Sequence, residues 1–198
     1  MTRNVAILIF DEVEVLDFSG PFEVFGVSGA RDPGERPFHV YTVAEKAGPV
    51  LARNGLSVNP TFTFASCPPP DILLVPGGRG TRREIHNEAL LNWVRVQAAR
   101  VELLLSVCTG ALLLAQAGLL DGLSATTHFL AFDELRALAP NTALCPDERY
   151  VDNGKIVLSA GVSAGIDMAL YVVARLLGEE RANETARYIQ YDYWPRPR

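Results

Sequence analysis

Cys108 is the residue whose type and position point most directly to chemistry. It follows Val101–Val107, an apolar run typical of a buried strand, and precedes Ala111–Ala117, a run typical of a short helix. A cysteine on a tight strand-to-helix turn is lifted out of the sheet, and the free N–H groups of the helix start point toward it. Since a helix N-terminus lowers the pKa of a thiol, this turn favours a nucleophilic thiolate. A core cysteine is the alternative, because a lone cysteine in an apolar run is commonly packed inside.

Asp17 is a second candidate. It lies between Leu16 and Phe18, shortly after the apolar run Val5–Phe10, which predicts a buried strand. Open α/β sheets bind ligands at the carboxyl ends of their strands, so a carboxylate at this position is placed to act in a site. The alternative is a helix-capping role, because Pro21 is favoured in a first helical turn and predicts a helix that starts close to it.

A glycine-rich turn over residues 76–80 follows another predicted strand, Asp71–Val75. Glycine lets the backbone approach a ligand closely, and the N–H groups of Gly77 and Gly78 are candidates for an oxyanion-type donor site. A phosphate cradle is the competing interpretation, but neither the GxGxxG nor the Walker spacing is present.

Thr109 and His128 are the remaining candidates. Thr109 places a hydroxyl directly beside Cys108. His128 closes a short predicted strand ahead of a helix over residues 129–139, and it is either a polar partner near Cys108 or a capping or core histidine. The second interpretation is favoured, because a thiol of low pKa needs no general base.

Composition excludes several classes of function. The formal charge is −5, without the clusters of Lys and Arg that phosphate contacts require, so we expect no nucleic-acid partner. There is neither a long apolar stretch nor a signal-peptide pattern, so we expect a cytoplasmic protein without membrane association. The three cysteines Cys67, Cys108 and Cys145 are widely spaced, which indicates neither a disulfide framework nor a metal site.

The order of the elements predicts the architecture. A βαβ crossover is expected from three consecutive segments: the strand before the glycine-rich turn, the amphipathic run Asn87–Arg100, and the strand before Cys108. Apolar strands of this kind form parallel sheets that are covered on both faces. The segment Arg149–Leu158, with Asn153-Gly154, predicts a hairpin with a type I′ turn. The aromatic and basic tail, residues 191–198, predicts a segment that docks on the domain or on a second subunit. We expect one domain over residues 1–198.

Together these residues resemble the ThiJ/PfpI superfamily, whose fold is that of the class I glutamine amidotransferases, over essentially the whole chain. The resemblance is carried by AILIFDEVEVLDFSGPFEVF, LLVPGGRG, SVCTGALLLAQAGLLDG, ATTHF and RYVDNGKIVLSAGVSAGIDMAL. Within the superfamily the pattern is most similar to the isonitrile hydratase branch and to the amidase-like modules of AraC-type regulators. These regulators carry a helix-turn-helix domain after the module, which we do not expect in a chain of 198 residues.

The resemblance implies a flavodoxin-like three-layer α/β/α sandwich, a mainly parallel sheet with a nucleophile elbow, a homodimer and no cofactor. It also implies that Cys108 is the nucleophile and Asp17 its carboxyl partner. Proteolytic relatives carry a histidine directly after the cysteine, where this chain has Thr109, so we expect no protease activity. Phe129 stands where hydratase-like sequences often have tryptophan, which bears on the shape of the pocket.

The function that these features favour is hydration of an isonitrile, a small electrophile, to an N-substituted formamide. Cys108 would attack the isonitrile carbon, Asp17 would deliver a proton, and the Gly78 and Thr109 N–H groups with the Thr109 hydroxyl would orient the intermediate. Two alternatives remain open. One is a glyoxalase or deglycase that acts on reactive carbonyls, although such relatives present a Glu near the thiol. The other is a redox or ligand sensor in which Cys108 is oxidised reversibly.

Overall fold

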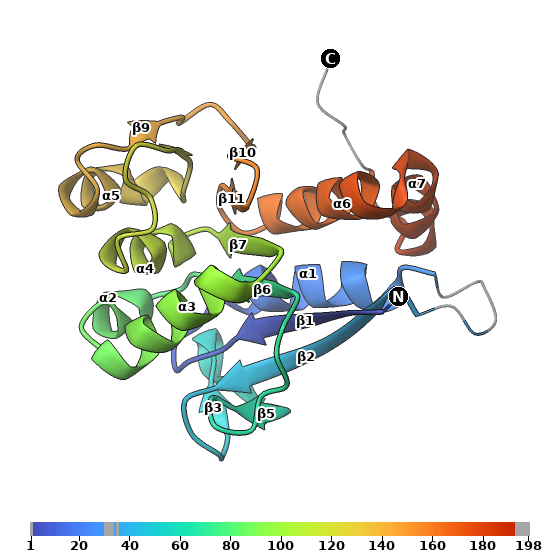
Figure 1. The fold of residues 1–198 in the computed structure, drawn as a ribbon, viewed down its shortest axis with the longest axis horizontal. Helices are drawn as coiled ribbons and strands as arrows, with labels where there is room; N and C mark the ends of the chain where they lie inside the picture. The colour runs from blue at the N-terminus through green and yellow to red at the C-terminus, as the bar shows by residue number, and fades with distance from the viewer. Residues whose placement is uncertain (1, 30–33, 35, 193–198) are drawn as a thin grey trace.

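The structure is a computed structural model that describes residues 2–29, 34 and 36–192. It contains a seven-stranded sheet of order β10-β11-β7-β6-β1-β2-β5, in which all neighbouring strands run parallel except β10 and β11 (Figure 1). The strands of this sheet are β1 (Arg3–Leu8), β2 (Phe38–Ala44), β5 (Phe62–Thr63), β6 (Ile72–Val75), β7 (Leu103–Val107), β10 (Tyr150–Asp152) and β11 (Ile156–Ser159). The expected mixed α/β fold with a mainly parallel sheet is confirmed.

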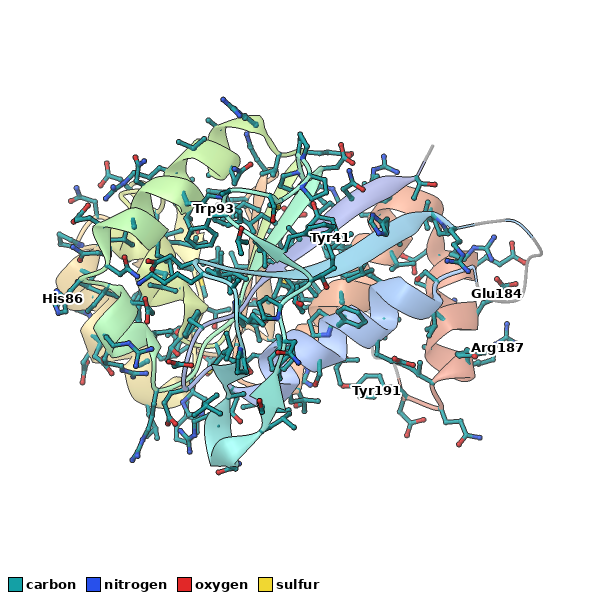
Figure 2. The ribbon with its side chains drawn as sticks, turned by 90° about the horizontal axis from the view of Figure 1, so that it is seen from below. Tyr41, His86, Trp93, Glu184, Arg187 and Tyr191 are labelled. Atoms are coloured by element: carbon teal, nitrogen blue, oxygen red, sulfur yellow. The ribbon has the colours of Figure 1, made fainter. Side chains whose placement is uncertain are left out.

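Helices cover both faces of the sheet. Helices α1, α6 and α7 pack together on one face, and α2 to α5 gather on the other (Figure 1). Trp93 of α3 and Tyr191, which follows α7, lie on opposite sides of the sheet (Figure 2). The α-helices are α1 (Val15–Val27), α2 (Thr81–Glu84), α3 (Glu88–Arg100), α4 (Gly110–Gln116), α5 (Phe132–Leu138), α6 (Ala164–Leu177) and α7 (Glu179–Tyr188).

Several short elements lie outside this sandwich. Two small strand pairs and two 3-10 turns complete the described part of the chain. They are the pair β3 (Val50–Leu51) and β4 (Ser57–Val58), the pair β8 (Ser124–Ala125) and β9 (Ala143–Leu144), and the turns η1 (Arg53–Gly55) and η2 (Phe129–Ala131). The β3-β4 pair is tied to the loop after β1, where Arg53 N–H donates to the Val13 carbonyl at 2.9 Å.

The core lies in the central strands. Every residue of β6 and β7 is buried, because both faces of a parallel sheet are covered by helices. This is the reason that both strands are uninterrupted apolar runs apart from Ser106. Strands β1, β6 and β7 are adjacent and parallel, so their carboxyl ends open onto the same edge of the sheet.

Two local predictions differ from the structure. Helix α1 begins at Val15, well before Pro21, because packing of Val15 and Phe18 against the core outweighs the preference of proline for a first turn. The hairpin β10-β11 is present, but its turn is not type I′: Gly154 has φ +83°, whereas Asn153 has no positive φ. The Asn153 side chain instead exchanges two hydrogen bonds with the backbone of Ser124, at 3.0 and 2.9 Å.

Gly165 fixes how α6 sits on the sheet. A Cβ at Gly165 would lie 2.9 Å from Cγ1 of Val107, the last residue of β7. We expect Gly165→Ala to lower the free energy of unfolding by about 1–3 kcal/mol through overpacking, measured by urea denaturation. Gly26 of α1 is the matched control: nothing lies within 4 Å of its added Cβ, so Gly26→Ala should be neutral or raise stability by up to about 1 kcal/mol. Equal effects of the two substitutions would contradict this packing.

Candidate active site

Cys108 occupies the turn between β7 and α4. Its backbone has φ +56°, a left-handed conformation that is uncommon for a residue with a side chain. Its N–H donates to the carbonyls of Ser159 (3.2 Å) and Ala160 (3.1 Å), and its own carbonyl accepts the hydroxyl of Thr127 at 2.8 Å. These contacts hold the strained backbone in place. Thr127 was not predicted from the sequence, where it is one of two consecutive threonines before His128.

Asp17 meets the thiol from the first turn of α1. Its side chain is fully buried, and Oδ2 accepts the N–H of Gly77 at 3.0 Å. The carboxyl group also shares a hydrogen bond with the Cys108 side chain, and Oδ1 has no further partner among the described residues. Of the two interpretations of Asp17, the structure favours a site residue over a helix cap. The two groups that the sequence singled out therefore lie together.

Burial is the main cause of the pKa shifts of Asp17 and Cys108. Removal from water raises the pKa of the Asp17 carboxyl from 3.8 to about 7, with a further contribution from the nearby Glu14 carboxylate. Removal from water, and then the Asp17 charge, raise the pKa of the Cys108 thiol to about 12. The prediction of a lowered thiol pKa is wrong for this reason: it counted the helix start and left out the burial of the sulfur beside a carboxylate.

The glycine-rich turn after β6 packs against Asp17 and against Thr109, the residue after Cys108. Gly77 donates to Asp17, and Gly78 N–H donates to the Thr109 hydroxyl oxygen at 2.9 Å. The Thr109 hydroxyl also contacts the Gly78 carbonyl (3.2 Å) and accepts from Thr81 (3.2 Å). The Gly78 N–H and the Thr109 hydroxyl, which we expected to orient a substrate, thus have partners within the protein. Their role in this structure is to fix the turn against Cys108.

Gly77 must be glycine for this contact. A Cβ at this position would lie 2.5 Å from the Thr109 nitrogen, 2.6 Å from the Thr109 hydroxyl and 2.9 Å from Asp17 Oδ2. Contacts under 3.0 Å force the surroundings to move. The space for a side chain at Gly77 is therefore taken by the two groups that it helps to position.

Two backbone N–H groups point at the sulfur. They belong to Thr109 and Val162, and both act to lower the thiol pKa against the larger effect of burial. The Thr109 N–H was predicted to orient the reaction intermediate, whereas in the structure it acts on the sulfur. Val162 was not predicted, because it lies 54 residues further along the chain, and its only sequence signal is the glycine-flanked turn over residues 161–165 before α6.

His128 caps the turn η2. Its Nδ1 accepts the N–H of Leu130 at 3.3 Å, which is the capping role that the sequence favoured. The ring packs on Phe129, with centroids 4.6 Å apart, and lies over Gly161, where a Cβ would be 2.5 Å from His128 Cδ2. His128 therefore borders the loop that carries Val162.

The surroundings of the pair are enclosed. The Cys108 side chain is 5% exposed. A cavity of about 410 Å³ opens beyond the carboxyl ends of β1 and β2, but Cys108, Asp17 and Thr109 do not line it. Cys67 and Cys145 are free, and within residues 2–29, 34 and 36–192 no cluster of three or more His, Cys, Asp or Glu side chains is arranged to hold a metal. In that same part of the chain no helix has the length and apolar character to cross a membrane.

Comparison with known proteins gives consistent matches. Residues 3–175 match the family model described as the DJ-1/PfpI family. The chain is 36% identical to the isonitrile hydratase of Pseudomonas putida over 197 residues, which is 100% of this chain and 81% of that protein. A crystal structure of a ThiJ/PfpI family protein from Pseudomonas syringae superposes with a TM-score of 0.87 at 32% identity, covering 98% of this chain and 77% of that one.

A regulator is also similar. The chain is 31% identical over 182 residues to the HTH-type transcriptional regulator CdhR of Pseudomonas aeruginosa, which is 92% of this chain and 53% of that protein. The chain therefore spans about half the length of this relative.

Protonation of Asp17 should be visible in the stability of the fold. The folded state keeps the Asp17 proton up to about pH 7, whereas the unfolded chain releases it near 3.8, so the stability of the native protein falls as pH rises between these values. Asp17→Asn cannot ionise and can still accept the Gly77 N–H. We expect it to be more stable than the native protein above pH 7 by up to about 4 kcal/mol, and to lose this advantage near pH 4. Urea denaturation at pH 4.5 and 8 measures the difference, and a gain independent of pH would contradict the assignment.

Proposed function

The chain belongs to the DJ-1/PfpI family, and we propose that it is a cysteine-dependent isonitrile hydratase, a lyase that converts an isonitrile and water to an N-substituted formamide. The observation that carries the proposal is the buried contact between the Cys108 thiol and the Asp17 carboxyl. Full-length similarity to the isonitrile hydratase of Pseudomonas putida supports this choice of reaction. The proposed substrate is a small organic electrophile, and no cofactor takes part.

The reaction begins with one proton shared by two groups. Between pH values of about 7 and 12 the Asp17–Cys108 pair holds a single proton, which either residue can carry. In the reactive arrangement the carboxyl is protonated and the sulfur is a thiolate, which accepts the N–H groups of Thr109 and Val162. An isonitrile carbon then meets a nucleophile and a proton donor at the same place.

The chemistry follows in two additions. The Cys108 sulfur forms a bond to the terminal isonitrile carbon while Asp17 gives its proton to that carbon, which produces a thioimidate and leaves Asp17 ionised. Asp17 then takes a proton from water as the water oxygen adds to the same carbon. Asp17 passes this proton to nitrogen and takes the second proton of the water as the carbon–sulfur bond breaks, so the formamide leaves and Cys108 is released as a thiolate. Cys108 and Asp17 recover their single shared proton, so atoms and charges balance.

The first test is turnover of a simple aryl isonitrile, followed as formamide formation. We expect Cys108→Ala to lose all measurable turnover, and Asp17→Ala to lose at least about 10²–10⁴-fold in kcat, the range for a general acid–base. In the native protein kcat/KM should rise with pH through about 7, where the pair reaches the one-proton state. Cys145→Ala, at a free and partly exposed cysteine, is the matched control and should keep full activity.

Retained turnover in Cys108→Ala or Asp17→Ala would refute the assignment. Without any isonitrile turnover, lactate formation from methylglyoxal would place the reaction among the glyoxalases instead. Selective oxidation of Cys108 by mild peroxide, with no turnover of either compound, would indicate a sensor.

We also propose that the protein is a cytoplasmic homodimer. Exposed apolar side chains on α1 and in the segment from β3 to β4 support this proposal, because such side chains are often covered by a partner when they lie together. These residues are Leu16, Phe22, Leu51 and Leu56.

The oligomeric state can be measured by size-exclusion chromatography with light scattering. We expect twice the monomer mass for the native protein and a monomer for Leu51→Glu, because a buried unpaired charge opposes association. Val96→Glu on α3 replaces an apolar residue that is also exposed and should leave the mass unchanged. A native monomer would contradict the proposal.

A further inference from the structure

Val162 is strained at the point where it faces the sulfur. Its φ is +49°, which is a genuine outlier for a β-branched residue. It lies two residues after Ala160, whose carbonyl accepts the Cys108 N–H at 3.1 Å, and its own N–H acts on the Cys108 sulfur. Such a conformation persists only when the surrounding structure over-determines it. The contacts on either side of Val162 therefore decide whether its N–H stays on the sulfur.

Arg149 makes contacts on both sides of Val162. Its carbonyl accepts the N–H of Ala160 at 2.9 Å, and its Nη2 donates to the Ser163 hydroxyl at 3.3 Å. Arg149 therefore contacts the chain on both sides of Val162. Its main chain binds Ala160, which precedes Val162, and its side chain binds Ser163, which follows it.

Asp167 anchors the arginine. It lies in the first turn of α6 and is 1% exposed, and its Oδ2 accepts both Arg149 Nε and the Tyr191 hydroxyl, the latter at 3.2 Å. Its Oδ1 has no partner among the described residues. A buried carboxylate depends strongly on its remaining partners, so Asp167 holds the guanidinium in a fixed place. Through this hydrogen bond Tyr191 brings the chain after α7 to the same carboxylate. Of the aromatic and basic tail, Tyr191 contacts α6 in this way, and residues 193–198 lie outside the described part of the chain.

We propose that Arg149 is a positioning residue, which through Ala160 and Ser163 keeps the Val162 N–H directed at the Cys108 sulfur. The inference rests on Cys108 being the reactive residue and not on the identity of the substrate. The titratable group that faces the sulfur is Asp17, on which Glu14, the residue before α1, acts in turn. Those that face Arg149 are Asp167 and Tyr191. None of these is altered in the test below.

The test measures the reactivity of Cys108 from pH 5 to 10 in the full chain, as its alkylation by iodoacetamide followed by mass spectrometry. Cys145 in the same molecules reports general thiol reactivity. The profile should rise through the first proton loss of the Asp17–Cys108 pair, near pH 7 in the native protein. We expect Arg149→Met to move this midpoint to higher pH and to slow alkylation near pH 7.5 by about tenfold, because the singly charged pair is less stable when the sulfur loses part of a hydrogen bond. Looser access alone would change the rate equally at every pH.

Two further variants separate positioning from charge and from folding. Arg149→Lys keeps the charge but has no fork to contact Asp167 and Ser163 together, so its midpoint should stay shifted. Ser163→Ala removes only the contact after Val162 and should shift the midpoint in the same direction by a smaller amount. Arg136→Met, in an exposed ion pair with Asp133, is the control and should match the native profile.

A native midpoint in Arg149→Met that remains folded by circular dichroism would overturn the proposal. So would recovery of the midpoint in Arg149→Lys, which would show that only the charge acts. If Arg149→Met fails to fold, Ser163→Ala decides alone, and an unshifted profile in it would also overturn the proposal.

Discussion

The contact between a thiol and a carboxyl group, both removed from water, is the constraint on which the rest of the site depends. Two ionised groups cannot occupy this place together, so Asp17 and Cys108 are limited to one negative charge over a wide pH range. The surrounding backbone is arranged to meet that one charge: Gly77 donates to the carboxyl, and Thr109 and Val162 donate to the sulfur.

Hydroxyl groups in this site serve the backbone. Thr109 and Thr81 are buried and bonded to each other and to the Gly78 carbonyl, and Thr127 holds the carbonyl of Cys108. Buried hydroxyls without partners are costly, so a threonine that is satisfied internally is a fixed part of the frame. The groups left to react are the Cys108 sulfur and the Asp17 carboxyl, which suits a reaction that needs one nucleophile and one mobile proton.

Much of this fold follows from the sequence, because β6 and β7 are buried on both faces and leave long apolar runs before Gly77 and Cys108. The site was predictable as far as it follows strand ends. The position of Val162 was not, since nothing local to its turn reveals that the turn packs against a cysteine 54 residues earlier. The sign of the thiol pKa shift was missed for a related reason: the helix start is visible in sequence, whereas burial beside Asp17 exists only after folding.

The strand order of the sheet makes the stability of the site depend on the stability of the core. The segments that follow β1, β6 and β7 carry Asp17, Gly77 and Cys108, and these three strands are adjacent at the centre of the sheet. Central strands are commonly among the last parts of a domain to open by local fluctuation. The site therefore has no stability of its own: it shares the cooperative unit of the core, and fraying at the sheet edges would leave the thiol and its proton donor in register.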